Sequence, residues 1–179
     1  MKQKKLTISF TEYNSEDELP ESIKNLIINA KKTALNAYAP YSKFMVGAAV
    51  LLANGKIVTG NNQENSAYPS GLCAERVALF YANAQYPKVA VEAIAIVAFQ
   101  NKKEVTNPVY PCGACRQVIL ESQSKQQTPI KLFFAGQSCI HSVDDASNLL
   151  PLKFDKDSLN NQRKVLQYIV YHPNNQICS

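Results

Sequence analysis

The chain has 179 residues, 46% of them hydrophobic, so it can bury one sizeable core and is too short for two comfortable domains. The net charge of +5 comes from dispersed lysines and one dense cluster, MKQKK, which we expect to be a solvated terminus. No segment approaches the roughly 18 apolar residues of a membrane span, and the start does not resemble a signal peptide. We therefore expect a cytoplasmic protein that binds neither membranes nor nucleic acid.

The first part of the chain predicts a short strand, a helix and a hairpin. The segment LTISFTEYNSED has room for one short strand. From Glu18 onward apolar residues recur at helical spacing, until APYS ends the helix. These residues are Leu19, Ile23, Leu26, Ile27, Ala30 and Ala34. The segment MVGAAVLLANGKIVTG indicates two strands joined at Asn54-Gly55, and the polar NNQENSAYPSG after it is rich in turn residues.

The second part of the chain alternates helices and strands. Residues 73 to 84 have the pattern of a buried helix, and the apolar run 91–99 is typical of a fully covered strand. PCGACRQVILES predicts a helix from Cys112, PIKLFFAG a strand, and DDASNLLPLKF a short helix and its exit. For VLQYIVY near the end, strand and helix remain open. This alternation predicts an α/β fold, a three-layer α/β/α sandwich with a mixed central sheet.

Five cysteines are an odd number for a disulfide framework, and three of them lie in two short motifs. Cys112 and Cys115 are three positions apart, so on the first turn of a helix they face the same way and can share an ion. Alone, this CxxC is ambiguous, because redox motifs use it as well. With Cys73 at another helix start, one catalytic Zn²⁺ per chain is the better explanation, since three ligands leave the fourth position open for water.

The sequence gives little support for the remaining histidines and cysteines as metal ligands. His141 and His172 have no partner at ligand spacing, so neither is a convincing fourth ligand. Cys139 and Cys178 have no polar or metal-like neighbours in the sequence. We expect these two cysteines to be structural or incidental thiols.

Three thiolates around Zn²⁺ carry a net charge of −1, which opposes ionisation of a bound water. Two features of the sequence withdraw negative charge. All three thiolates lie at predicted helix N-termini, where the dipole and free N–H groups favour anions. Arg76 and Arg116 each follow a ligand closely, and a guanidinium that donates to a thiolate removes more charge. A surface ion pair is the alternative role for each arginine.

Glu75 lies two positions after Cys73. In a regular helix about 200° separates such side chains, so only an irregular first turn lets both reach one cavity. A carboxylate beside metal-bound water can take its proton and pass it to substrate. A zinc triad with a Glu that is not a ligand is the arrangement of zinc deaminases, written here as C-x-E…P-C-x-x-C.

Three segments of the sequence resemble a known family. AYAPYSKFMVGAAV, GNNQENSAYPSGLCAERVAL and PCGACRQVI are similar to the core blocks of the homotetrameric, zinc-dependent cytidine deaminases, in matching order and approximate spacing. LLPLKF resembles the C-terminal aromatic element of that family. The resemblance implies a catalytic domain over residues 21–155, with extensions at 1–20 and 156–179.

The resemblance also implies roles for individual residues. Asn62 and Glu64 are alternate residues of an extended segment, with side chains on one face, and match a pair that holds ribose hydroxyls. Phe44 matches the aromatic residue that packs on the pyrimidine ring, and Ala74 a position whose backbone N–H orients the reacting water.

Two further residues extend the resemblance to the assembly. Tyr68 and Phe154 match residues that reach the active site of a neighbouring subunit. The resemblance therefore implies a homotetramer whose active sites are shared across interfaces.

The implied function is hydrolytic deamination of cytidine and 2′-deoxycytidine in pyrimidine salvage. Deamination of a nucleoside antibiotic such as blasticidin S is an alternative, since that family shares C-x-E and P-C-x-x-C. Such a substrate would not need the ribose contacts of Asn62 and Glu64. Editing of a polynucleotide would need a basic and aromatic channel that the sequence lacks. A non-catalytic, zinc-stabilised binding module would have no use for Glu75.

Overall fold

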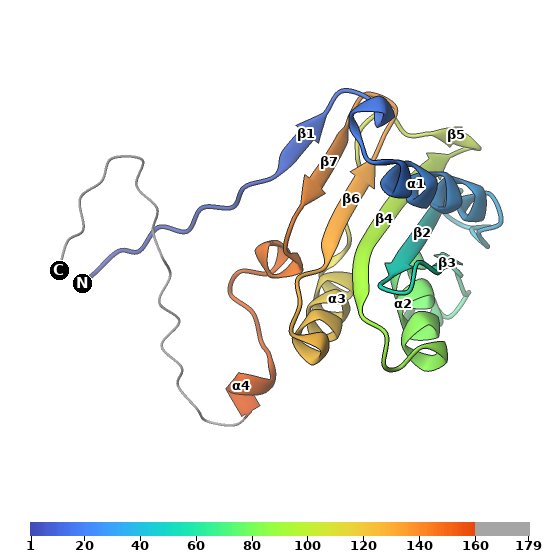
Figure 1. Ribbon diagram of the computed structural model, residues 1–179. Coiled ribbons are helices and arrows are strands. Elements are labelled where there is room, and N and C mark those ends of the chain that lie inside the picture. The colour runs from blue at the N-terminus through green and yellow to red at the C-terminus, as the bar shows by residue number, and fades with distance from the viewer. Residues whose placement is uncertain (160–179) are drawn as a thin grey trace.

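In the computed structural model, which describes residues 1–159, helices lie on both faces of one mixed sheet (Figure 1). The strand order is β1-β7-β6-β4-β2-β3, and β5 pairs with β4. The strands are β1 (Thr11–Tyr13), β2 (Phe44–Leu52), β3 (Ile57–Asn61), β4 (Val91–Gln100), β5 (Lys103–Glu104), β6 (Lys131–Ala135) and β7 (Ile140–Val143). Only β4 and β6 run parallel among these pairs. The predicted mixed sheet is confirmed.

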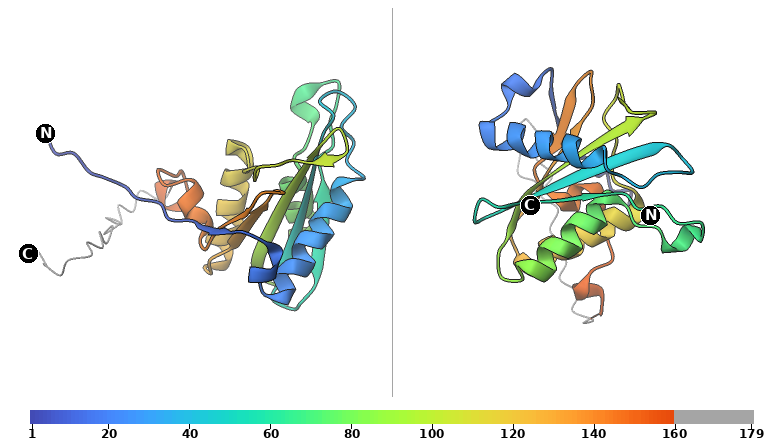
Figure 2. Two further views of the ribbon diagram at one scale, coloured as in Figure 1. Left: turned by 90° about the horizontal axis from the view of Figure 1, so that it is seen from above. Right: turned by 90° about the vertical axis from the view of Figure 1, so that its right-hand side faces the viewer.

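The long helices divide between the two faces of the sheet. Helix α1 (Glu21–Ala34) covers one face, while α2 (Ala74–Gln85) and α3 (Gly113–Gln126) lie side by side on the other (Figure 2). A short helix, α4 (Lys156–Leu159), follows the sheet. The predicted three-layer α/β/α sandwich is therefore confirmed. None of the helices in residues 1–159 has the length and apolar composition needed to cross a membrane.

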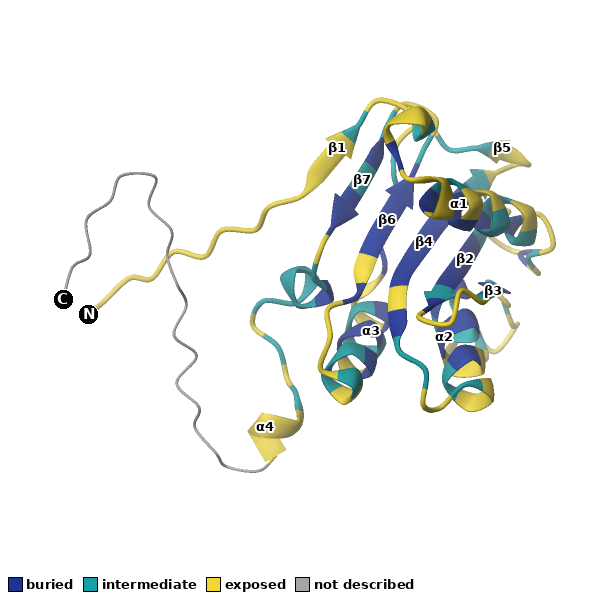
Figure 3. Cartoon of the chain, viewed as in Figure 1, coloured by how far each residue is buried: buried dark blue, intermediate teal, exposed yellow. Residues whose placement is uncertain are grey.

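The central strand β4 is covered on both faces, and this explains the apolar run in its sequence. Ile94 and Ile96 belong to the core beneath α2 and α3, whereas Ala95 and Val97 belong to the core beneath α1. Because successive strand residues point to opposite faces, the part of a strand that is covered on both sides must be apolar at every position, as residues 93–98 are here. Figure 3 shows this strand as buried along most of its length.

Glycines allow the layers to approach closely. A Cβ added at Gly47 of β2 would overlap the backbone oxygen of Ala30 in α1, and one at Gly60 of β3 would overlap the backbone of α2 at Ala78. The predicted hairpin turn is confirmed at Gly55, whose φ of +78° lies in the left-handed region that glycine adopts without strain.

The structure adds elements that the sequence patterns did not predict. Strand β7 was not predicted, and it pairs with β1, the short strand expected in LTISFTEYNSED, so the first 20 residues contribute an edge strand to the sheet. The short helix expected in DDASNLLPLKF is a 3₁₀ turn at Ala146–Leu149. The segment VLQYIVY, His172 and Cys178 lie outside the described residues.

Candidate metal centre and active site

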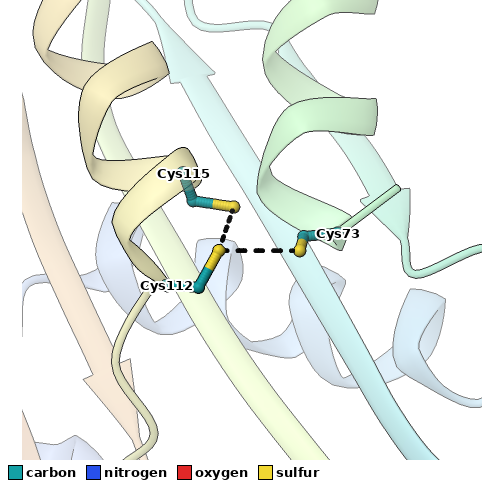
Figure 4. Close-up of side chains that lie close together, drawn as sticks. All are labelled: Cys73, Cys112 and Cys115. Carbon is teal, nitrogen blue, oxygen red and sulfur yellow. Dashed lines mark hydrogen bonds between the residues drawn. The ribbon is translucent and has the colours of Figure 1, made fainter. Parts of the chain in front are cut away.

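Three cysteines meet where the N-termini of α2 and α3 lie side by side (Figure 4). Cys73 is the N-cap of α2, Cys112 is the N-cap of α3, and Cys115 is in the first turn of α3. The Sγ atom of Cys112 lies 3.8 Å from that of Cys73 and 3.5 Å from that of Cys115. The sequence prediction that these residues converge at helix N-termini is confirmed. We call them the cysteine triad.

The geometry of the cysteine triad fits a zinc ion. Zinc–sulfur bonds of about 2.3 Å in a tetrahedral arrangement place the sulfurs about 3.8 Å apart. The two measured separations, 3.8 and 3.5 Å, are within a few tenths of an ångström of that value. Cys112 is exposed, and Cys115 is buried. One side of the triad therefore remains accessible.

The protonation of the thiols shows why the triad needs a cation. The pKa of Cys73 falls to about 5, first because of its interaction with the nearby Cys115 thiol and then because Arg76 lies beside it. The pKa of Cys115 is raised by the same interaction and by the burial of its thiol. One thiolate therefore forms readily, whereas ionising all three in such proximity requires a bound positive charge.

The two arginines after the ligands have different surroundings. The Nη2 atom of Arg76 lies 3.8 Å from the Cys73 sulfur, in agreement with the charge-withdrawing role predicted for it. Arg116 instead donates to backbone carbonyls, from Nε to Pro111 at 2.9 Å and from Nη1 to Leu149 at 3.1 Å. Neither role considered for Arg116, a contact with a thiolate or a surface ion pair, is seen within residues 1–159, because its guanidinium ties the start of α3 to the turn at Leu149.

The backbone at Cys73 explains how Cys73 and Glu75 serve one site. Cys73 is extended (φ −73°, ψ 153°), so the irregular first turn that the spacing requires is present. Glu75 is only 5% exposed. Burial raises the pKa of its carboxyl group, and the negative charge of Cys73 raises it further. Glu75 is thus a buried carboxyl group beside the triad, with a raised affinity for a proton.

The side chain of Asn62 is bonded to the start of β2. Its Oδ1 accepts from the Val46 N–H at 2.7 Å, and its Nδ2 donates to the Phe44 carbonyl at 2.9 Å. Phe44, the first residue of β2, is half-buried. Asn62 therefore fixes the backbone on both sides of Met45, at the start of the strand that carries Phe44.

Glu64 lies at a pocket formed by the turn before β2 and the segment after β3. Its carboxylate accepts from the N–H groups of Tyr41 and Ser42, at 2.9 and 3.3 Å, and from the Ser42 hydroxyl. The Ser42 hydroxyl is the main reason why the pKa of Glu64 is lowered. The pocket, of about 320 Å³, is lined by Tyr41, Ser42, Glu64, Asn65 and Tyr68. The wall of this pocket therefore includes the Glu64 carboxylate, whose oxygens are hydrogen-bond acceptors.

The remaining predicted site residues lie around this region. Ala74, the first residue of α2, is fully buried, and its N–H is one of the first-turn groups without an intrahelical acceptor. Tyr68, in a 3₁₀ turn, is 77% exposed, and Phe154 is 60% exposed. Both aromatic rings are therefore available to a second subunit.

A second group of potential metal ligands was missed in the sequence. The side chains of Glu12, Cys139 and His141 place their ligand atoms within 4.8 Å of one another. The expectation that Cys139 and His141 lack metal-like partners was therefore wrong. The unrecognised signal was the two-residue spacing of Cys139 and His141, because residues two apart in an extended chain point to the same face. Because β7 was not predicted, the two-residue spacing of Cys139 and His141 could not be interpreted.

Comparisons with known proteins agree with this site. The family model for the cytidine and deoxycytidylate deaminase zinc-binding region matches residues 20–129. A cytidine deaminase of Sporosarcina psychrophila is 48% identical over 99 residues, 55% of this chain and 68% of the relative. One of Halalkalibacterium halodurans is 47% identical over 96 residues, 54% of this chain and 68% of the relative.

Solved structures show the same likeness. The crystal structure of cytidine deaminase from Burkholderia pseudomallei matches with a TM-score of 0.63 and 39% sequence identity. The match covers 73% of this chain and 97% of that one. The chain therefore belongs to the zinc-binding cytidine and deoxycytidylate deaminase family.

Proposed function

We propose that the protein hydrolyses cytidine and 2′-deoxycytidine to uridine and 2′-deoxyuridine, with release of ammonia. The observation that carries this proposal is the buried Glu75 carboxyl group beside the cysteine triad. A zinc ion with a purely structural role does not need a carboxyl group beside it. Glu75 therefore favours an enzyme over a non-catalytic binding module. The relatives and the solved structure named above are cytidine deaminases, and the comparisons give no support to an antibiotic deaminase.

Cys73, Cys112 and Cys115 would hold the zinc, which when bound supplies a Lewis acid that lowers the pKa of a water molecule. Glu75 takes a proton from the attacking water on its carboxylate and delivers it to N3 of the pyrimidine. The water oxygen bonds to C4, and the same carboxylate takes the second proton from the new C4 hydroxyl group and passes it to the amine. The C4–N bond then breaks, ammonia leaves and C4 keeps the oxygen as a carbonyl group. Arg76 limits the negative charge by donating to the Cys73 sulfur. The backbone N–H of Ala74 orients the water.

The substrate is held by groups on the β2 side of the site. The ring of Phe44 packs on the pyrimidine, and Glu64 accepts a hydrogen bond from a ribose hydroxyl. Asn62 completes the ribose contact with the remaining hydrogen-bonding capacity of its amide, while its bonds to Val46 and Phe44 hold β2 in place. Asn62 and Glu64 therefore favour a nucleoside as substrate, because cytosine without its ribose would make no use of these contacts.

We further infer a homotetramer in which Tyr68 and Phe154 complete the site of a neighbouring subunit. The exposure of both rings supports this inference, because large aromatic side chains are usually buried or engaged at interfaces. The catalytic domain would span residues 21–155, with extensions at 1–20 and 156–179. The proposed setting is pyrimidine salvage in the cytoplasm.

Incubation of the pure protein with cytidine tests the activity directly. We expect loss of the ultraviolet absorbance of cytidine together with release of one ammonia per uridine formed. Blasticidin S and single-stranded DNA that contains cytosine serve as the competing substrates. Turnover of either one, with cytidine left intact, would replace the proposed function.

A further inference from the structure

We propose that Glu12, Cys139 and His141 form a second zinc site, distinct from the cysteine triad, which fastens β1 to β7. We call these three residues the edge cluster. Glu12 and His141 are directly opposite each other in the β1–β7 ladder. Cys139 lies two positions before His141, on the same face of the extended chain. Three different ligand types therefore converge at the edge of the sheet, from β1, from β7 and from the residue that precedes β7. A water molecule would take the fourth position on the ion.

The distances within the edge cluster suit a tetrahedral ion. Zinc bonds of about 2.3 Å to sulfur and 2.0–2.1 Å to nitrogen place these two atoms about 3.5 Å apart. The Cys139 sulfur and the His141 Nε2 lie 3.5 Å apart. The His141 Nε2 lies 2.7 Å from the Glu12 carboxylate, and an ion needs about 3.4 Å. The Glu12 side chain is 57% exposed, so it can move outward by that amount.

The imidazole of His141 is held in the orientation that a metal ligand needs. Its Nδ1 lies 2.6 Å from the Tyr110 hydroxyl, and its ring packs against Phe10 at a centroid distance of 4.8 Å. Only 13% of the side chain is exposed. Histidine ligands generally use their second nitrogen for such a hydrogen bond, which fixes the ring and the tautomer. Nε2 is thereby directed at Cys139 and Glu12.

The protons balance when an ion binds. An ion bound at Nε2 requires the neutral imidazole with its ring proton on Nδ1, where it can be donated to the Tyr110 oxygen, and any second ring proton leaves to water. The Cys139 thiol releases its proton to water. One thiolate and one carboxylate neutralise a divalent cation, with imidazole as a neutral ligand. Mixed sulfur, nitrogen and oxygen donors of this kind are characteristic of Zn²⁺.

The second ion has a structural consequence for the N-terminal strand. β1 has only three residues and pairs with β7 at the edge of the sheet. Glu12 and His141 are 129 positions apart in the chain, so an ion between them closes a long loop. We expect zinc to slow the opening of β1. The edge cluster binds more weakly than the cysteine triad, because it has one thiolate instead of three and an exposed carboxylate.

Zinc content measured in buffers of increasing free Zn²⁺ tests the proposal on the full-length chain. Wild type should bind two equivalents per chain, the second at higher free zinc than the first. In Cys139→Ser and His141→Gln the second equivalent should weaken by at least tenfold, while Cys178→Ser, which removes another thiol, should keep both. Glu12→Gln changes an exposed side chain and provides the same test if His141→Gln does not fold.

Two further readouts separate this site from the cysteine triad. Co²⁺ added to protein whose tight site holds zinc should give thiolate-to-cobalt absorption in wild type but not in Cys139→Ser. Hydrogen exchange of the β1 amides should slow with zinc in wild type and in Cys178→Ser, but not in the three edge-cluster variants. A single equivalent at saturating zinc, or a second equivalent that persists in all three edge-cluster variants, would overturn the proposal. Because zinc is counted directly, an inactive protein with two ions would contradict the proposed function and support this site.

Discussion

The Sγ atoms of Cys73 and Cys112 lie 3.8 Å apart, although the two residues are 39 positions apart in the chain. Each is the N-cap of its helix, with an extended backbone that directs the thiol toward the other helix. Two helix N-termini thereby direct free N–H groups and the positive ends of their dipoles at one point. The fold thus concentrates positive potential where the thiolates must form.

Cys112→Ala removes one ligand of the cysteine triad. We expect the tightly bound zinc equivalent and cytidine deamination to be lost together, because two thiolates hold zinc far less strongly than three. Zinc retained against a chelator, measured beside activity, checks this prediction. Cys178→Ala is the matched control and should keep both. Full activity in a zinc-free preparation of wild type would rule out a catalytic metal.

Glu75→Gln separates the proton carrier from the metal ligands. The amide keeps the shape of the carboxyl group but cannot carry a proton, so turnover should fall by about 10²–10⁴-fold or more. Zinc content and cytidine affinity should stay close to wild type. Glu92→Gln, at an exposed position of β4, is the control. Activity within a few-fold of wild type would exclude Glu75 from proton transfer, and loss of zinc would make it a ligand or a structural support.

Sequence patterns predicted the central fold well because each of the main elements has a local cause. The two-sided burial of β4 requires a continuous apolar run, and the positive φ of Gly55 favours glycine. The convergence of the cysteine triad was predictable as well, because a CxxC at a helix start places two thiols on one face.

The missed parts depend on contacts between distant segments. β7 has only four residues and depends for its pairing on β6 and on β1, which lies far away in the sequence. Arg116 could not be placed because its acceptor, the Leu149 carbonyl, lies in a turn that the pattern does not specify. The hydrogen bonds of Asn62 to β2 likewise follow from the strand arrangement and not from the N-x-E spacing.

Glu64→Ala tests the ribose grip. Loss of a charged acceptor should lower kcat/KM for cytidine by roughly tenfold to a hundredfold, since hydrogen bonds to charged groups are among the stronger ones. Zinc content should not change, because Glu64 contacts the turn at Tyr41 and Ser42 and not the triad. Steady-state kinetics on cytidine measure the effect, with Glu92→Ala as the control. Kinetics equal to wild type would refute the ribose assignment.

Asp145→Asn tests a pH-dependent contribution to stability. Burial alone would raise the pKa of Asp145, but hydrogen bonds from Ser147 and Gln123 outweigh it and lower the pKa. A lowered native pKa stabilises the fold above the unfolded pKa of about 4, and this stabilisation is lost as the pH falls through the native value. Urea unfolding should therefore show a wild-type advantage at pH 7 that shrinks below pH 4. A difference in the free energy of unfolding between wild type and Asp145→Asn that stays the same at every pH would contradict an origin in the lowered pKa of Asp145.

Gly47→Ala tests the close packing of α1 on β2. An added Cβ would meet the Ala30 oxygen, the Ala34 nitrogen and the Ala34 Cβ, and all of these belong to a helix whose inner face is buried. The helix must shift outward, which should cost about 1–3 kcal/mol, the usual range for overpacking. At this chain length that corresponds to a fall in Tm of roughly 2–12 °C.

Gly113→Ala is the matched control, because a Cβ there meets nothing within 4 Å and the residue lies in the first turn of α3. Alanine favours a helix more than glycine does, so this variant should melt at or above the wild-type temperature. Both variants should be compared in the same zinc-saturated buffer, so that metal binding does not obscure the difference. If Gly47→Ala melts no lower than Gly113→Ala, the contact between α1 and β2 is looser than its geometry indicates.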